Sequence, residues 1–253
     1  MGKIIAVVNQ KGGVGKTTTA VNLTAALHAL GKKVLLCDFD PQANATSGLG
    51  LNKRKLKHSV YDVVVNGVNV KEAIASTDFG DVLPATADLA GAAVELITMP
   101  EPHKQLKIAL DQVKNNYDLI FIDSPPSLEM LTLNGLAAAD GILVPVQCEY
   151  YALEGLTDLM NTLRMVKKRI NPNLEIFGVA LTMFDGRTNF SIQVAQEVRR
   201  HFPGKVYANA VPRNVRLAEA PSHGLPVMAY DKHSKGAQAY KAMAEEIVKS
   251  LGG

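Results

Sequence analysis

The sequence predicts an α/β fold: a single doubly wound, mostly parallel sheet with helices on both faces. Several strand-sized segments are apolar throughout instead of alternating, which is typical of parallel strands buried on both faces. Helical patterns fall between these segments, and a glycine-rich loop separates the first strand from the first helix. This alternation favours a doubly wound domain. Because such domains reach 253 residues, we expect residues 1–253 to form one domain.

The expected elements follow in chain order. Short apolar segments bounded by glycine, asparagine or aspartate predict strands at residues 3–8, 33–37, 118–122, 141–146 and 176–183, with a weaker candidate at 82–84. Apolar residues at helical spacing predict helices at residues 17–30, 106–113, 153–166, 192–200 and 237–251. The first helix stops at Gly31, a residue type that commonly ends helices. Residues 44–102 are otherwise expected to form loops and short helices, and no linker marks a domain boundary.

The composition is that of an ordinary soluble domain, with 47% hydrophobic and 20% charged residues. Cys37 and Cys148 each lie in an apolar segment, so we expect neither a disulfide framework nor a cysteine-ligated metal. The apolar residues 4–8 are too few for a signal peptide or a membrane span. These features indicate a reduced, cytoplasmic compartment.

Charge is unevenly distributed along the chain, although the net charge is only +3. Residues 1–159 have a balance of −4, whereas residues 160–253 have a balance of +7. The asymmetry indicates either a polyanionic partner for the C-terminal part or a solvated helix face, and charge alone leaves both open.

The most informative segment lies between the first expected strand and the first expected helix. Glycines there allow successive backbone N–H groups to surround phosphate oxygens, which a Cβ would obstruct. The ammonium of Lys16 would contact the β- and γ-phosphates, and the hydroxyl of Thr17 would ligate Mg²⁺. The sequence therefore predicts a phosphate-binding loop made of Lys11, Gly12, Gly13, Val14, Gly15, Lys16, Thr17 and Thr18.

One departure from the usual P-loop pattern narrows this prediction. Gln10 stands where that pattern has its first glycine, and a second lysine, Lys11, follows it. The string resembles the deviant Walker A motif of the MinD/ParA class of P-loop ATPases. In that class the first lysine reaches across a nucleotide-sandwich dimer to the partner's phosphates, so the resemblance implies a catalytic role in trans for Lys11. Without the resemblance, a solvent-exposed loop lysine is an equally good interpretation.

Two carboxylates follow each other closely in the segment Asp38-Phe-Asp40-Pro-Gln. Residues two apart on a strand point the same way, and open α/β sheets bind ligands at the carboxyl ends of their strands. The segment resembles switch I of the partitioning ATPases, which implies that Asp40 orients the attacking water and that Asp38 supports Mg²⁺. The alternative role for Asp40 is an N-cap for a following short helix.

Asp123 ends the apolar segment 119–122 and is followed by Ser-Pro-Pro. An apolar strand that ends in aspartate downstream of a P-loop has the form of a Walker B motif, in which the carboxylate contacts Mg²⁺ through water. The Ser-Pro-Pro run resembles switch II of the same family.

The resemblance to the Soj/ParA chromosome-partitioning ATPases extends along nearly the whole chain, through residues 44–50, 145–155, 185–189 and 212–224. It implies a homodimer formed with ATP that binds double-stranded DNA non-specifically at the nucleoid. It also implies stimulation by a ParB/Spo0J-type centromere-binding protein, and adenine contacts from Pro212 and Asn214. From the residues themselves, base specificity rests only on the absence of the guanine-reading lysine in residues 182–185.

Four cations of the C-terminal part are candidates for DNA contact. Arg187 and Arg216 lie in segments that resemble the family's DNA-contacting positions, and Lys232 and Lys235 form a second pair close in sequence. No aromatic residues alternate with these cations, so we expect phosphate contacts and not base readout.

Three other classes of protein fit the sequence less well. A biosynthetic enzyme such as dethiobiotin synthetase needs a second pocket, and no further basic or nucleophilic cluster accompanies the loop. A nitrogenase-type iron protein needs cysteines placed to hold a cluster, whereas Cys148 is expected inside a strand. The main alternative, a MinD-like membrane-positioning ATPase, needs a detachable amphipathic C-terminal helix. Residues 244–253 hold two acids and little beyond a domain helix, so no membrane partner is expected.

Overall fold

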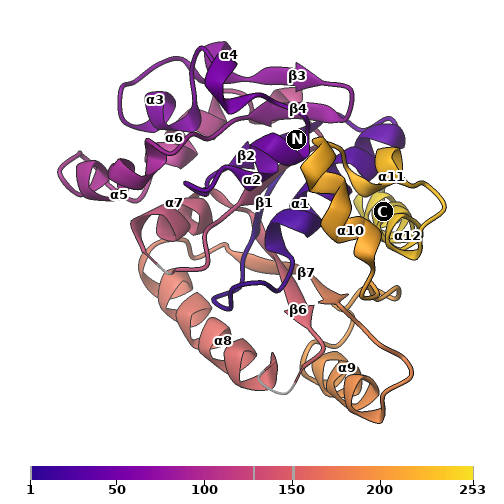
Figure 1. Ribbon diagram of the computed structural model, residues 1–253. Coiled ribbons are helices and arrows are strands. Elements are labelled where there is room, and N and C mark those ends of the chain that lie inside the picture. Colours follow the sequence, from indigo (N-terminus) through magenta and orange to yellow (C-terminus); the bar gives the residue numbers. More distant parts are fainter. Residues whose placement is uncertain (1, 128, 150–151, 253) are drawn as a thin grey trace.

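A computed structural model describes residues 2–127, 129–149 and 152–252 of the chain, with only the backbone for residues 152–154. Within these residues, seven strands form one sheet in the order β3-β4-β2-β5-β1-β6-β7, and only β3 and β4 pair antiparallel (Figure 1). The predicted mostly parallel α/β fold is thereby confirmed. The strands are β1 (Lys3–Val7), β2 (Val34–Asp38), β3 (Ala75–Thr77), β4 (Gly80–Leu83), β5 (Leu119–Asp123), β6 (Gly141–Gln147) and β7 (Glu175–Thr182).

All five predicted helices are present, with small shifts at their ends. Thr188 and Ser234 begin two of them as N-caps, because their side chains accept hydrogen bonds from the backbone three residues on. The helices are α1 (Lys16–Ala29), α2 (Asn44–Gly48), α3 (Val60–Val64), α4 (Val70–Ala73), α5 (Leu89–Ile97), α6 (Gln105–Asp111), α7 (Met130–Ala138), α8 (Ala152–Arg169), α9 (Asn189–His201), α10 (Val215–Glu219), α11 (Val227–Tyr230) and α12 (Lys235–Leu251), with 3-10 turns at Lys53–Lys55, Lys114–Asn116 and Ala220–His223.

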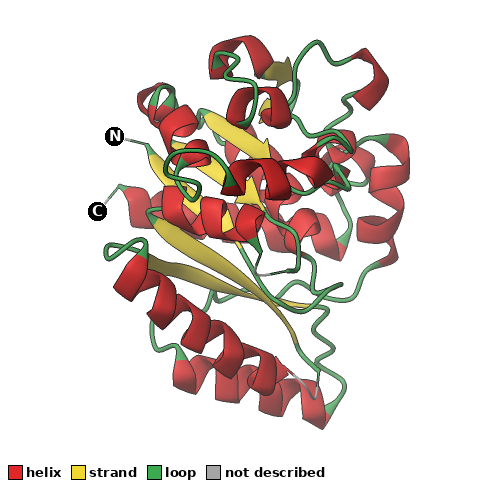
Figure 2. Ribbon diagram, turned by 90° about the vertical axis from the view of Figure 1, so that its left-hand side faces the viewer, coloured by secondary structure: helices red, strands yellow, loops and turns green. Residues whose placement is uncertain are grey.

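The helices cover both faces of the sheet (Figure 2). On β1, Ile4 and Ala6 belong to one apolar core, and Ile5 and Val7 belong to the other. The first core is closed by α3, α5, α6, α7, α8 and α9, and the second by α1, α11 and α12. Burial on both faces explains why the strands are apolar at every position.

Several details differ from the sequence-based expectation. Strand β2 extends through Asp38, and β6 ends at Gln147, so Cys148 follows the strand and the prediction that it lies inside one is wrong. Helix α7 was missed because residues on all its sides are buried, which removes the polar face that marks an amphipathic helix. Strand β3 was missed because three residues of mixed polarity carry no pattern.

Candidate active site

The parallel register brings the sequence-predicted carboxylates to one edge of the sheet. Asp123 is the partner of Val7 on β1 and of Asp38 on β2, so the three strands end side by side. The glycine-rich loop leaves β1 at the same edge and leads directly into Lys16, the first residue of α1. The predicted loop and both strand-end aspartates therefore meet at the carboxyl edge, where α/β sheets bind ligands.

The backbone of the loop requires glycine at two positions. Gly13 has φ 75° and Gly15 has φ 90°, both in the left-handed region that side chains disfavour. A Cβ placed on Gly12 or on Gly13 would meet no atom within 4 Å, so the loop faces open space there. The exposed backbone of Gly12 and Gly13 and the start of α1 make a surface suited to phosphate oxygens.

Neighbouring strands hold the loop in place. The side-chain amide of Asn9 donates to the carbonyl of Pro145 at 2.8 Å, and its oxygen accepts the N–H of Lys11 at 3.0 Å. The hydroxyl of Thr182, at the end of β7, donates to the carbonyl of Val14 at 2.8 Å. Val14 itself is buried, so it anchors the loop to the protein instead of facing a ligand.

Lys16 is a buried cation at the base of the loop. Its ammonium donates to the carbonyl of Lys11 at 3.2 Å. Burial lowers the pKa of Lys16, while the charges of Asp123 and Asp40 act to raise it. An ammonium that has lost part of its hydration, beside open N–H groups, fits the phosphates that the sequence predicts.

Asp123 is fully buried, and among the described residues neither of its carboxylate oxygens has a hydrogen-bond partner. Burial, followed by the charge of Asp38, raises the pKa of Asp123 well above its usual value. The hydroxyl of Thr17 acts to lower that pKa, although its geometry falls short of a hydrogen bond. A buried carboxylate without partners is costly unless a cation or water satisfies it. Asp123 and the nearby hydroxyl of Thr17 therefore fit a hydrated divalent cation such as Mg²⁺.

Asp38 has partners for both oxygens. Its Oδ2 accepts the N–H of Thr46 at 2.7 Å and the Thr46 hydroxyl at 2.6 Å, and its Oδ1 accepts the N–H of Asp40 at 3.4 Å. Burial raises the pKa of Asp38 to about 6, although these hydrogen bonds oppose the rise. Asp38 thus fixes the conformation of the segment that carries Asp40. Thr46 was missed by reasoning from residue chemistry, and only the resemblance covered its segment.

Asp40 does not cap a helix, so that alternative is wrong. Its Oδ1 accepts the N–H of Gln42 at 2.9 Å, which closes a turn within the loop. The N-cap of α2 is Ala43, with φ 52° and no side-chain cap. Asp40 is partly exposed, and its charge opposes the lowering of the Lys16 pKa, so its carboxylate acts on the phosphate-loop side of the chain.

Lys11 lies at the surface, with its ammonium 3.7 Å from a carboxylate oxygen of Glu149. The other oxygen of Glu149 lies 3.5 Å from the guanidinium of Arg213. The Lys11 side chain is about one-third exposed, and within the described part of the chain its ammonium is held by this exposed ion pair, which contributes little stability. Glu149 was missed because only the resemblance of residues 145–155 pointed there; Tyr150 and Tyr151 of that segment lie outside the described residues.

A cavity of about 220 Å³ adjoins the loop. Its lining includes Pro212 and Asn214, the two residues to which the resemblance assigns adenine contacts. The backbone bridge between Phe184 and Pro212 brings the segment that begins at Pro212 close to the end of β7. The side chain of Asn214 accepts the N–H of Arg216 at 2.9 Å and so caps α10. The cavity is lined by Gly15, Thr18, Thr182, Met183, Val211, Pro212, Arg213, Asn214, Leu217, Ala218 and Tyr240.

The predicted DNA-contacting cations are exposed, but two are paired with acids. Arg187 donates to both oxygens of Asp185, at 2.9 and 2.7 Å, and lowers the pKa of that carboxyl to about 2. Arg216 pairs with Glu219 at 2.7 Å and with Asp231 at 3.4 Å, which places it beside the segment of the predicted lysines. Lys232 and Lys235 are exposed just before and at the start of α12.

Among the described residues, no helix is long and apolar enough to cross a membrane. The same part of the chain holds no group of three or more histidine, cysteine, aspartate or glutamate residues placed to bind a metal. A cation at the active site would therefore be held by few side chains, together with phosphate and water, as is usual for Mg²⁺.

Comparison with known proteins identifies the family. The AAA domain family matches residues 2–176. The chain is 56% identical to the sporulation initiation inhibitor protein Soj of Bacillus subtilis, over 98% of both chains. It is 50% identical to the chromosome-partitioning ATPase Soj of Thermus thermophilus, over 96% of this chain and 94% of that protein.

Among solved structures, cobyrinic acid a,c-diamide synthase from Mycobacterium smegmatis with bound ADP and magnesium superposes with a TM-score of 0.86. It is 38% identical and covers 100% of this chain and 96% of its own. The similarity to the Soj proteins is higher in identity and about equally complete. This chain belongs to the Soj/ParA family of chromosome-partitioning ATPases.

Proposed function

We propose that this chain works as one P-loop domain and is an ATP- and Mg²⁺-dependent switch for chromosome or plasmid partitioning. ATP binding drives a sandwich homodimer that binds double-stranded DNA non-specifically, and hydrolysis releases it. A ParB/Spo0J-type protein stimulates hydrolysis, and the protein acts in the cytoplasm at the nucleoid. The observation that carries the proposal is a second, partly exposed lysine, Lys11, on a loop that already has a buried cation in Lys16.

We assign each site residue a role from its surroundings and from the family resemblance. Lys16 and the N–H groups of residues 12–18 bind the phosphates. Thr17 and Asp123 would hold the Mg²⁺, which would neutralise phosphate charge. Asp38 supports this site by fixing the chain between β2 and α2. Asp40 orients the attacking water.

Two features of the loop support dimerisation. The side of Gly12 is open, so a second loop can approach its backbone closely. Lys11 can leave the exposed ion pair with Glu149 at little cost and contact the phosphates of the partner subunit. A cation supplied in trans stabilises the charge that develops on the transferred phosphoryl group. Dimerisation and catalysis are thereby coupled.

The proposal is tested by sedimentation with ADP, with ATP and with a non-hydrolysable ATP analogue, each with and without duplex DNA. We expect a dimer only with ATP or its analogue, and DNA binding only by the dimer. Lys11→Ala should bind ATP yet remain monomeric or inactive, whereas the surface control Lys32→Ala should behave as wild type. An ATP-dependent gain in binding to lipid vesicles, in place of DNA, would favour the MinD-like alternative.

A further inference from the structure

A run of basic residues follows helix α2, in the part of the chain whose charge balance is negative. Residues 41–61 contain no aspartate or glutamate, whereas four lysine or arginine residues stand within five positions of one another. These four residues, Lys53, Arg54, Lys55 and Lys57, are called the basic turn. Runs of cations without acids among them are typical of surfaces that bind polyanions.

Backbone hydrogen bonds and one asparagine hold the basic turn in place. The side-chain oxygen of Asn52 accepts the N–H of Arg54 at 3.0 Å, and the backbone carbonyl of Asn52 accepts the N–H of Lys55 at 2.9 Å. Just after the turn, the N–H of Val60 donates to the carbonyl of Pro84 at 2.7 Å. The turn is thus an ordered part of the protein surface.

Three of the four cations have no partner within the described part of the chain. The ammonium of Lys53 donates to the carbonyl of Gln42 at 2.7 Å. Arg54, Lys55 and Lys57 are exposed, and their side chains form no ion pair or hydrogen bond there. They are therefore available to a ligand, and replacing them should leave the fold intact.

The basic turn begins close to the segment that carries Arg216. Gly50 and Gly224 have positive φ values, of 85° and 65°, and their backbones meet: a Cβ on Gly224 would lie 3.3 Å from the Cα of Gly50. Gly224 closes the 3-10 turn that directly follows α10, the helix of Arg216. The basic turn starts only three residues after Gly50, so it adjoins this segment.

The lysines predicted to contact DNA lie in the same layer of the fold. Leu49 of α2, Ala220 after α10 and Ala237 of α12 belong to one apolar core. Lys232 and Lys235 stand just before and at the start of α12. The basic turn therefore adjoins the layer that carries three of the four cations predicted to contact DNA.

We propose that the basic turn is a second contact surface for double-stranded DNA. Each subunit offers Arg54, Lys55 and Lys57 to phosphates of the duplex that Arg216 contacts, and these contacts carry no sequence information. The inference rests on the proposed DNA binding of the ATP-bound dimer. It adds a surface from the N-terminal part of the chain to the cations predicted from the C-terminal part.

Duplex phosphates fit the basic turn better than other polyanions do. Single strands are held by stacking of their bases on aromatic side chains, and residues 50–60 include no phenylalanine, tyrosine or tryptophan. Protein surfaces that bind anionic membranes combine cations with exposed apolar side chains. Between residues 41 and 61 no large hydrophobic side chain is exposed. Phosphate contact alone accounts for a surface made only of cations.

Removal of the three unpaired cations tests the proposal. The neutral variant is Arg54→Gln/Lys55→Gln/Lys57→Gln, which leaves Lys53 with its hydrogen bond to Gln42. Fluorescence anisotropy of a labelled duplex is measured against salt, with a non-hydrolysable ATP analogue bound. We expect the affinity at low salt to fall at least tenfold. The slope of log affinity against log salt should become shallower by about 0.9 for each lost contact, hence by about 2 or more for a dimer.

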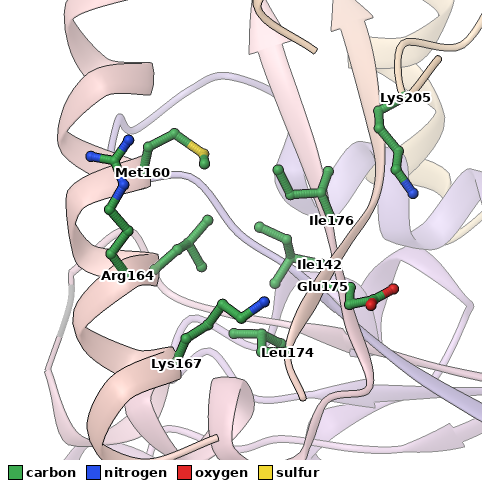
Figure 3. Close-up of a pocket in the computed structure, with 9 residues that line it drawn as sticks. Ile142, Met160, Arg164, Lys167, Leu174, Glu175, Ile176 and Lys205 are labelled. Carbon is green, nitrogen blue, oxygen red and sulfur yellow. The ribbon is translucent and has the colours of Figure 1, made fainter. Parts of the chain in front are cut away.

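Arg164, Lys167 and Lys205 provide a control with the same residue types. They line a cavity between α8 and the edge strand β7, and Figure 3 shows the first two opposite Lys205. Three strands separate β7 from β2, whose end lies near the basic turn. Among the described residues, none of these three cations forms an ion pair. The control Arg164→Gln/Lys167→Gln/Lys205→Gln should bind DNA with wild-type affinity and slope.

A charge-conserving variant separates the charge of the turn from its shape. Arg54→Lys/Lys55→Arg/Lys57→Arg keeps three cations at the same positions, and it should bind DNA nearly as wild type does because phosphate contact depends mainly on charge. All three variants should bind ATP and dimerise as wild type does, which sedimentation with the analogue checks.

Unchanged affinity and salt slope in the neutral variant would overturn the inference while leaving the proposed DNA switch in place. An equal loss in the control would also overturn it, because net charge alone would then explain the effect. Binding to anionic vesicles that the neutral variant loses, with DNA binding retained, would assign the basic turn to a membrane. Wild-type protein that binds no DNA in any nucleotide state would overturn the proposed switch, and this inference with it.

Discussion

Thr46 donates two hydrogen bonds to one oxygen of Asp38, from its N–H at 2.7 Å and from its hydroxyl at 2.6 Å. The same hydroxyl accepts the N–H of Ala85 at 2.9 Å. Asp38, Thr46 and Ala85 are all buried, so the end of β2, the short helix α2 and the segment after β4 are joined in one polar network. The loop that carries Asp40 is thereby fixed at both ends.

Replacing Thr46 by valine should destabilise the protein by about 2–3 kcal/mol. Valine has nearly the same shape, but it removes a donor from Asp38 and leaves the N–H of Ala85 buried without a partner. Urea unfolding measures the change, with Thr46→Ser as the control that keeps the hydroxyl and should cost about 1 kcal/mol or less. Equal stability of Thr46→Val and wild type would show that the network contributes nothing.

Lys16→Ala should lower ATP affinity roughly a hundredfold or more, because Lys16 is the buried cation of the phosphate loop. Calorimetric titration with ATP measures this loss. Lys32→Ala serves as a control for the removal of a lysine outside the site. Retained micromolar affinity in Lys16→Ala would sink the assignment of the loop.

Asp40→Ala should bind ATP normally but hydrolyse it at about one hundredth of the wild-type rate or below. It should therefore accumulate as an ATP-bound dimer. Asp40→Asn separates the carboxylate from the turn, because asparagine keeps an acceptor for the N–H of Gln42. If the charge orients water, both variants are equally slow in a phosphate-release assay. Wild-type turnover in Asp40→Asn would assign the residue a purely structural role.

Gly12→Val should leave ATP binding intact and abolish ATP-dependent dimerisation. Within one subunit a Cβ at Gly12 meets nothing within 4 Å, so the added side chain clashes only with a partner. Gly13→Val is the contrasting variant, because its φ of 75° strains the loop itself and should weaken ATP binding. Light scattering with ATP distinguishes them, and a dimeric Gly12→Val protein would contradict an interface at the loop.

Arg187→Glu and Arg216→Glu should each weaken binding to DNA duplexes, by the same factor whatever the sequence of the duplex. ATP binding and dimerisation should persist in both variants. Each lost phosphate contact lowers the slope of log affinity against log salt by about 0.9, and a dimer loses one contact from each subunit. Fluorescence anisotropy against salt, with ATP and with ADP, measures the effect. Equal affinity in both nucleotides, or a strong preference for one sequence, would overturn the proposed DNA switch.

Local chemistry explains how much of this protein was predictable. The glycine string requires its residues at fixed spacing, and Asp38 and Asp123 each end an unbroken apolar strand, so sequence alone placed them at one edge of a parallel sheet. Family resemblance added roles for Lys11 and Asp40 that spacing does not imply. The five predicted helices were found because each is amphipathic or ends at a clear signal, whereas α7, which has buried residues on all its sides, has neither.

Only the tertiary structure decided which distant side chains meet. Thr46 and Glu149 carry no sequence signal for their partners, because a single hydroxyl or carboxylate acquires its role from whatever the fold places within about 3–4 Å. The same holds for the cavity beside the glycine-rich loop, whose lining comes from residues 15 to 240. Periodicity and spacing determine elements and local motifs, since these depend on neighbours along the chain. Contacts between elements depend on how the sheet and its two helix layers pack, and the sequence pattern does not encode them locally.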